Sequence, residues 1–322
     1  MNRRTSLRLA AAASLLSLAL PFSAGAYPDK PIRLVVSFPP GSGADTTARY
    51  VAQKLGERLG KPVVVENRPG ANSFIAAQAV AGADPDGHTI FLASNSPMAT
   101  NVAIFKRLPY DPVKDFAPVA RLTRGVMAVV VPASSGAITI GELAERSRAQ
   151  PGTLNYGAGA ASYQIATELF LHLAGGRATP VPYKGVAPAL SDLAGGQLDF
   201  AFADLGAVVP FLQSGKVRML AVSADRRVDA FPKVPTLQES GFRDYYMINW
   251  TAAFVPARTP APIANLLGEH LQAIYRLPEG VAKVRQSYGE PFFGDANELR
   301  RFQIEEISRW EQAARQAGMQ KQ

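Results

Sequence analysis

The sequence predicts an α/β protein with parallel sheets, divided into two lobes. Short apolar segments alternate with segments of helical periodicity along the chain, as in strand–helix–strand units. The 322 residues exceed one ordinary core and suggest two domains of about 150 residues each. Two glycine-rich turns, at residues 41–43 and 157–159, lie far apart in the chain, so we expect one in each lobe.

The elements follow in order from residue 32. Residues 32–38 are almost continuously apolar, as expected of a buried parallel strand. Apolar residues then recur at helical spacing through residues 48–59, and Asp45 stands where an N-cap belongs. Further strands are expected at residues 63–66, 89–93, 126–131, 154–156, 181–183, 198–202 and 217–222, with 251–255 as the last. Further helices are expected at residues 75–81, 142–148, 164–173, 187–193, 263–275 and 296–317.

The first 26 residues have the pattern of a secretory signal peptide. Arg3, Arg4 and Arg8 precede an apolar run at residues 9–20, which is too short to span a bilayer. Small residues at 24–26 suit signal-peptide cleavage, so we expect a mature protein that begins at Tyr27 and is exported to the periplasm.

Composition excludes several kinds of chemistry. The chain has no cysteine, which removes disulfides, thiolate metal sites and thiol nucleophiles. Removal of the signal takes away three of 34 basic residues, leaving 31 against 26 acidic ones and a net charge of +5. The basic residues are scattered and show no stripe with interleaved aromatics, so we expect no nucleic-acid partner.

An enzymatic site is not indicated either. His88, His172 and His270 show no metal-binding spacing, and no Gly-x-Ser-x-Gly segment occurs. The first glycine-rich turn lacks the lysine of a phosphate loop, and the second lacks the third glycine of a dinucleotide fingerprint. We therefore expect no catalytic residues, no metal and no cofactor.

The two glycine-rich turns instead suggest an anion site between the lobes. In open α/β sheets, ligands bind beyond the carboxyl ends of the strands. Each turn leads into a helix, and helix N-termini carry unpaired N–H groups and a partial positive charge. Two such turns facing each other would bind a small anion.

Eight segments, taken together, resemble one known family. They are FPPGSGAD at residues 38–45, VENRPGA at 65–71, PDG at 85–87, LPYDP at 108–112, DFAPV at 115–119, VPYKG at 181–185, VPT at 234–236 with Glu239 and Gly241, and Pro256 with Thr259 and Pro260. In this order they resemble the Bug-type solute receptors of tripartite tricarboxylate transporters, over essentially the whole mature chain.

The resemblance implies a periplasmic binding protein of type II, a Venus flytrap with two strands crossing between lobes. We expect lobe 1 at residues 27–124 plus 250–322 and lobe 2 at 125–249. It further implies that the protein captures a small carboxylate and delivers it to the transporter's membrane subunits, and we expect a monomer. A ligand-sensing protein acting on a membrane signalling partner is the alternative.

The expected ligand contacts come from the ends of strands and the turns that follow them. They are Phe38, Gly41, Ser42, Gly43, Asp45, Ser94, Asn95, Gly157, Gly159, Ser162, Gln164, Tyr183, Lys184 and Asp204. The glycines could instead only permit tight turns, Ser162 could only cap a helix, and Lys184 could only be a surface charge. Gln164 stands where the family usually has a histidine, and Asp204 could orient a hydroxyl or amine.

Overall fold

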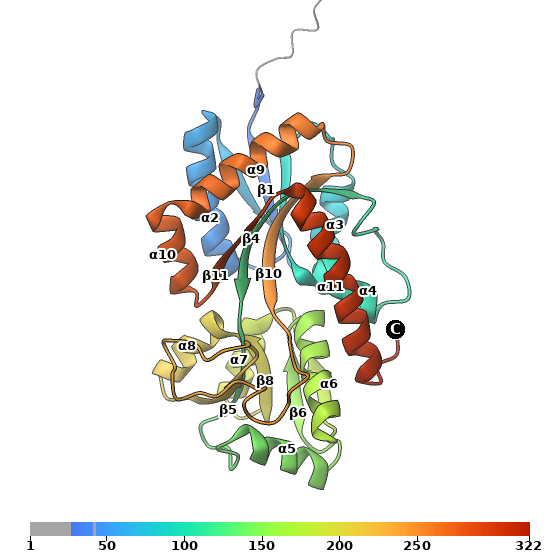
Figure 1. The fold of residues 1–322 in the computed structure, drawn as a ribbon, viewed down its shortest axis with the longest axis vertical. Helices are drawn as coiled ribbons and strands as arrows, with labels where there is room; N and C mark the ends of the chain where they lie inside the picture. Colours follow the sequence, from blue (N-terminus) through green and yellow to red (C-terminus); the bar gives the residue numbers. More distant parts are fainter. Residues whose placement is uncertain (1–26, 41–42) are drawn as a thin grey trace, which may run out of the picture.

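Two mixed β-sheets form the frame of the molecule, one in each lobe (Figure 1). The computed structural model of the protein describes residues 27–40 and 43–322. The predicted signal peptide lies outside the described residues, as do Gly41 and Ser42. We call the upper unit of Figure 1, with the six-stranded sheet, lobe 1 and the lower unit, with the five-stranded sheet, lobe 2.

The sheet of lobe 1 has the strand order β11-β4-β10-β3-β1-β2. Its strands are β1 (Ile32–Val36), β2 (Val63–Asn67), β3 (Thr89–Ser94), β4 (Phe116–Gly125), β10 (Asn249–Pro256) and β11 (Glu290–Gly294). The strands β1, β2 and β3 are parallel, whereas β10 runs antiparallel to both β3 and β4, and β11 runs antiparallel to β4.

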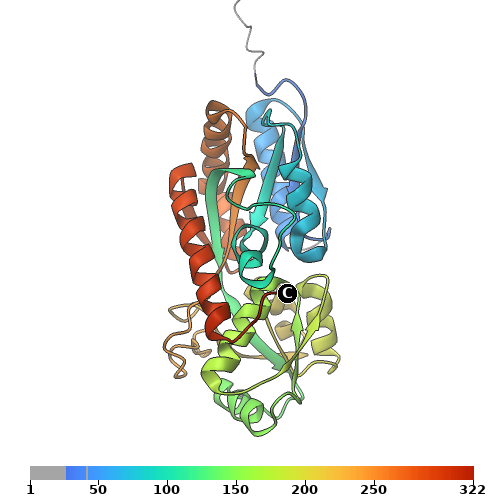
Figure 2. The ribbon, with the colours of Figure 1, turned by 90° about the vertical axis from the view of Figure 1, so that its right-hand side faces the viewer.

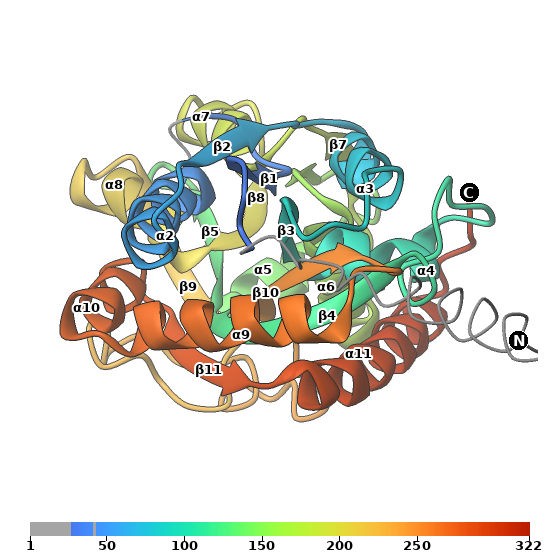
Figure 3. The same cartoon turned by 90° about the horizontal axis from the view of Figure 1, so that it is seen from above.

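Helices cover both faces of this sheet (Figure 3). They are η1 (Ala71–Ser73), η2 (Ser96–Thr100), α2 (Gly43–Leu59), α3 (Phe74–Ala81), α4 (Asn101–Ile104), α9 (Ala261–Arg276), α10 (Pro278–Gln286) and α11 (Ala296–Gln316). On one face, Leu55 of α2 and Leu267 of α9 pack against Leu34. On the other, α3 and α11 enclose a second core that includes Phe91 and Trp310.

The sheet of lobe 2 has the order β7-β6-β8-β5-β9. Its strands are β5 (Met127–Pro132), β6 (Asn155–Ala158), β7 (Thr179–Pro182), β8 (Phe200–Asp204) and β9 (Val217–Val222), and its helices are α5 (Ile140–Ala149), α6 (Ala161–Ala174), α7 (Val186–Ala194) and α8 (Leu205–Gln213). The strand β6 is parallel to β7 and β8, whereas β5 is antiparallel to β8 and β9.

The chain passes between the two sheets twice. The strand β4 ends at Gly125 and β5 begins at Met127, and the chain returns where residues 223–248 lead into β10. Helix α11 also reaches from lobe 1 down to α6 of lobe 2 (Figure 2). The prediction of a two-lobed α/β protein is confirmed, but the prediction of purely parallel sheets is wrong. A strand that crosses to the other lobe needs a returning strand of opposite direction, and β4 and β10 pair antiparallel for this reason.

Several elements were not predicted from the sequence, namely β4, β11, α4, α8, α10 and the two short helices. In β4, buried and part-exposed positions are mixed and Pro118, Arg121 and Arg124 interrupt the apolar residues, so no apolar run marks the strand. In α8, Pro210 lies inside the helix, which conflicts with a sequence-based helix assignment. The strand at 251–255 is consequently not the last, because β11 follows it.

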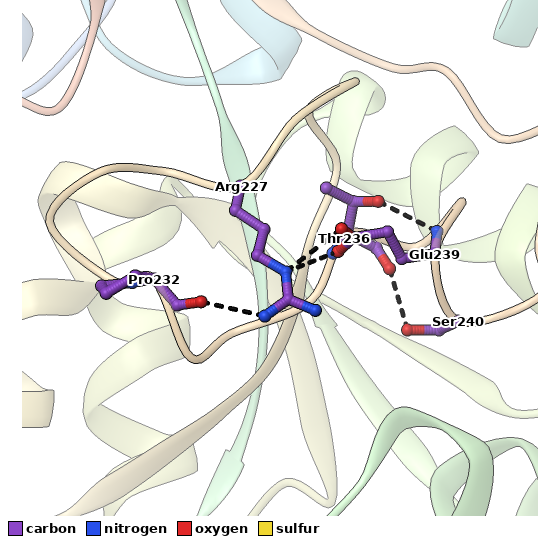
Figure 4. Close-up of polar contacts among 5 residues, drawn as sticks. All are labelled: Arg227, Pro232, Thr236, Glu239 and Ser240. Atoms are coloured by element: carbon purple, nitrogen blue, oxygen red, sulfur yellow. Dashed lines mark hydrogen bonds and ion pairs between the residues drawn. The ribbon is translucent and has the colours of Figure 1, made fainter.

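The long connection at residues 223–248 is held together by an ion pair (Figure 4). The Arg227 guanidinium donates to both carboxylate oxygens of Glu239, at 2.9 and 3.1 Å, and to the Pro232 carbonyl oxygen at 2.9 Å. Glu239 also accepts from the backbone N–H of Thr236, whose hydroxyl accepts from the Glu239 N–H in return. This closed set of bonds gives a structural role in the loop to Glu239 and to Thr236 of the VPT segment, which carry part of the family resemblance.

Within the described part of the chain, no helix is long and apolar enough to cross a membrane. The same residues bring together no group of three or more His, Asp or Glu side chains suited to a metal ion.

Candidate ligand-binding site

A cavity of ≈ 320 Å³ lies between the lobes, where strands end and helices begin. Its lining comes from both lobes and from the crossing segments. It comprises Val36, Phe38, Thr47, Leu92, Ser94, Asn95, Ser96, Thr123, Arg124, Gly125, Val126, Ala160, Ser162, Tyr163, Val186, Asp204, Leu205, Gly206, Ala207, Asn249, Trp250, Thr251, Tyr275, Val284, Gln286, Ser287 and Gly289. A second hollow, of ≈ 350 Å³, lies beside Gly56 and Lys61, but lobe 1 alone lines it and it is more open to the surface.

Lobe 1 contributes buried polar groups at the carboxyl end of β3. Asn95 is only 2% exposed, and its Nδ2 has no hydrogen-bond partner among the described residues. The Ser94 hydroxyl is likewise unpaired there. Because burying an unpaired polar group costs free energy, these donors are suited to a ligand that accepts hydrogen bonds.

Lobe 2 presents the N-termini of three helices to the cavity. Ala160 and Ser162 lie at the start of α6, Val186 is the first residue of α7, and Leu205 begins α8. The start of η2 in lobe 1 faces the same space, and its Ser96 hydroxyl lies 3.3 Å from that of Ser162 across the lobes. The first N–H groups of a helix have no partner within the helix, and these groups together with the helix dipoles favour an anion in this cavity.

The acidic side chain of the cavity is Asp204, at the end of β8. The Tyr163 hydroxyl donates to its Oδ2 at 2.6 Å, and Asn249 Nδ2 donates to its Oδ1. Burial raises the pKa of Asp204, and both hydrogen bonds oppose that rise. Burial and the neighbouring carboxylate raise the pKa of Tyr163 well above its usual value, so this hydroxyl stays a donor.

The basic side chain among the lining residues is Arg124, and its charge is already paired. Its guanidinium donates twice to Glu290 Oε2, at 2.7 and 3.0 Å. Glu290 also accepts from Arg226 of the 223–248 connection at 2.7 Å, and these arginines lower the pKa of the Glu290 carboxyl against the effect of burial. The cavity thus offers neutral donors rather than an unpaired cation.

Five of the residues predicted from the sequence are brought together in this cavity: Phe38, Ser94, Asn95, Ser162 and Asp204. Gly41 and Ser42 lie outside the described residues. Gly43 begins α2.

Asp45 is the third residue of α2, so its prediction as the helix cap is wrong. Its carboxylate accepts from Asn67 at 2.8 Å and from Arg49 at 3.0 Å, and the residue is 3% exposed. These contacts hold the start of α2 against the end of β2.

The glycines of the second turn are tightly packed by protein atoms. A Cβ on Gly157 would come within 2.9 Å of Ala189 and Leu198 side-chain atoms, and one on Gly159 within 2.7 Å of the Gly185 carbonyl group. The helix α7 and the turn before it therefore require both glycines, whether or not a ligand is bound.

The remaining predicted residues do not line the cavity. Gln164 is half-buried in the first turn of α6, and Lys184 is exposed. The Tyr183 hydroxyl donates to Asp192 at 2.7 Å, and this bond raises the pKa of Tyr183 to about 12.

Sequence reasoning missed several polar lining residues, including Thr47, Thr123, Asn249, Gln286 and Ser287. Asn249 lies two residues before the strand predicted at 251–255, and its position opposite Asp204 depends on the chain crossing between lobes. Gln286 and Ser287 end a helix that was not predicted, so no local signal could place them.

Two lobes joined by two crossing segments, with a cavity at their junction that polar groups of both lobes line, define a solute-binding protein of the periplasmic type. The chain belongs to the tripartite tricarboxylate transporter receptor family, whose model matches residues 47–319. The predicted Bug-type resemblance is confirmed. Protein BugT of Bordetella pertussis is 33% identical over 304 residues, which cover 94% of this chain and 93% of BugT.

Solved structures are similar over nearly the whole molecule. An R. palustris protein solved with adipate is 34% identical with a TM-score of 0.88, covering 92% of this chain and 100% of that one. MatC from Rhodopseudomonas palustris, solved with bound malate, is 30% identical with a TM-score of 0.83, covering 89% and 99%.

Proposed function

We propose that the protein captures a small carboxylate in the cavity between its lobes and delivers it to a tripartite tricarboxylate transporter in the membrane. It would act as an exported, non-catalytic monomer whose lobes, residues 27–124 plus 250–322 and residues 125–249, bind the ligand from opposite sides. Ligand contacts would come from Phe38, Ser94, Asn95, Ser162 and Asp204.

One observation carries the proposal. Four helix starts and the unpaired Asn95 amide converge on one interlobe cavity, while its arginine is neutralised by Glu290. Backbone and side-chain N–H donors suit a carboxylate, which accepts about four hydrogen bonds. The binding of adipate and malate by similar structures supports the same class of ligand.

A thermal-shift screen of small carboxylates, with uncharged amides of the same skeletons as controls, tests this function. A ligand at 100 times its dissociation constant should add about 2.7 kcal/mol of stability, and the amides should add none. Nuclear magnetic resonance should show each bound carboxylate chemically unchanged. The proposal fails if no carboxylate raises the melting temperature or if any hit is converted.

Delivery requires a test in cells. Deletion of the gene should abolish uptake of the carboxylate found in the screen, and the protein recovered from the periplasm should begin at Tyr27. Continued uptake together with an altered transcriptional response to the ligand would instead favour the sensing alternative.

A further inference from the structure

We propose that Asp204, Tyr163 and Asn249 form a subsite that selects carboxylates bearing a second group able to donate a hydrogen bond, a hydroxyl or an ammonium. This inference rests on the proposed function and narrows its ligand class. The three residues come from the end of β8, the start of α6 and the start of β10, so they meet where the crossing strand enters lobe 1.

The oxygen atoms of Asp204 and Asn249 can accept further hydrogen bonds from a ligand. Each oxygen of Asp204 receives one protein donor, although each has room for about one more hydrogen bond. Asn249 Oδ1 is buried and has no partner among the described residues. A plain carboxylate is itself only an acceptor, so it can satisfy none of these atoms.

The charges around the cavity strengthen the preference for a carboxylate that also carries a hydrogen-bond donor. No lysine lies among the described residues that line the cavity, and the guanidinium of Arg124 is held by Glu290. An ionised ligand placed beside Asp204 would therefore bring two like charges together without compensation. A hydroxyl or ammonium on the ligand separates the two carboxylates and satisfies Asp204 directly.

Glu306 is a buried acidic residue that, unlike Asp204, does not face the cavity. Glu306 of α11 is 1% exposed and accepts from the indole N–H groups of Trp250 and Trp310, at 2.9 and 3.1 Å. It lies outside the cavity lining, and Arg309 pairs with it at 3.0 Å. Asp204 differs because it is only half-buried, lines the cavity and has no cation beside it among the described lining residues.

Calorimetry at pH 7.5 with ligands of matched skeleton tests the subsite. One series is succinate, malate and aspartate; the other is adipate, 2-hydroxyadipate and 2-aminoadipate. In the series that fits the cavity, the hydroxy or the amino acid should bind at least about tenfold tighter than the plain acid. The hydroxyl and ammonium arms identify which donor the subsite takes.

Asp204→Asn keeps the side-chain shape but puts a donor where one acceptor stood. The ratio of dissociation constants between plain and donor-bearing acids should fall close to one in this variant. Tyr163→Phe removes one donor that orients Asp204 and should reduce the ratio partway. Glu239→Gln, outside the cavity, should leave the ratio as in the unmodified protein. Far-ultraviolet circular dichroism checks that each variant folds.

The outcomes distinguish failure of the subsite from failure of carboxylate capture itself. If the plain acid binds as tightly as both donor-bearing acids, or if Asp204→Asn keeps their advantage, the subsite is wrong while carboxylate capture stands. If no small carboxylate binds, either in these two series or in the thermal-shift screen, carboxylate capture is overturned and the subsite with it.

Discussion

Two carboxylates of lobe 2, Asp204 and Glu239, show how differently the same chemical group is used. Glu239 is exposed, and its partners Arg227 and Thr236 lie within the same connection. Asp204 lines the cavity, and its partners come from α6 and β10, elsewhere in the chain. A carboxylate bonded within one segment holds that segment in shape, whereas one with unused acceptor capacity in a cavity is available to a ligand.

Their titration differs in direction for the same reason. The Thr236 N–H and the Arg227 guanidinium lower the pKa of Glu239, because both favour its charged form. Burial raises the pKa of Asp204, because its hydrogen bonds do not fully replace the lost hydration. Groups bonded within the fold should therefore affect stability when changed, and groups facing the cavity should affect affinity.

The largest expected effect is the loss of stability caused by Gly159→Val. The sequence predicted that Gly159 contacts the ligand, whereas in the structure this glycine is packed against protein atoms. Gly159→Val would force a side chain against the Gly185 carbonyl group, at 2.7 Å from the first added carbon. Overpacking of this kind costs about 1–3 kcal/mol of unfolding free energy, or more against backbone atoms. Binding should weaken as well, because Val186 follows that carbonyl and lines the cavity.

Urea denaturation and calorimetry on the same samples measure both effects of Gly159→Val. Gly136→Ala is the control, because no atom lies within 4 Å of the added carbon there. Unchanged stability with lost binding would show that Gly159 acts by close approach to the ligand instead.

A pair of buried asparagines sharpens the comparison next. Asn95 lines the cavity with an unpaired Nδ2, whereas Asn101 donates to the Asn72 carbonyl at 2.8 Å and to the Tyr110 hydroxyl at 3.0 Å. Asn95→Ala should weaken carboxylate binding about tenfold or more, since a hydrogen bond to a charged group contributes about 1.5–3 kcal/mol. Asn101→Ala should leave affinity unchanged and lower the unfolding free energy by about 1–3 kcal/mol.

Calorimetry gives the affinity of each asparagine variant, and denaturation curves give its unfolding free energy. An equal loss of affinity in the two variants would contradict the assignment of Asn95 to the ligand and of Asn101 to the fold.

The raised pKa of Asp204 predicts a smaller effect on the ligand-free protein. A carboxyl group whose pKa is higher in the folded state favours folding most below its ordinary pKa near 4, and this contribution is lost as the pH rises through the folded value. At neutral pH, Asp204→Asn should therefore raise the melting temperature without ligand. Calorimetric scans from pH 4 to 8 measure it, and the gain should shrink toward pH 4.

The smallest expected effect is at Glu239, with the opposite sign. Its lowered pKa contributes stability above the ordinary value near 4, and this is lost as the pH falls through the folded value. Glu239→Gln should slightly lower the melting temperature at neutral pH, less so in acid, with affinity unchanged. An affinity change as large as that of Asn95→Ala would contradict the assignment of this ion pair to the loop alone.

Local pattern in the sequence determined most of the secondary structure. The apolar run of β1 and the helical spacing of α2 and α9 are visible in neighbouring residues, because buried faces repeat every two or every 3.6 positions. The strand β4 was not predicted because its buried residues do not form an apolar run. Which of its residues are buried depends on its antiparallel pairing with β10 and β11, which are distant in the sequence.

For the site, the sequence by itself determined that strand ends and helix starts such as Ser94, Asn95, Ser162 and Asp204 would carry polar groups. Only the tertiary structure decided which of them meet. Asn249 and Asp204 are 45 positions apart and Ser96 and Ser162 are 66 apart, yet both pairs touch. Their contact depends on two strands crossing between lobes and on how the lobes pack, and no spacing along the chain encodes that geometry.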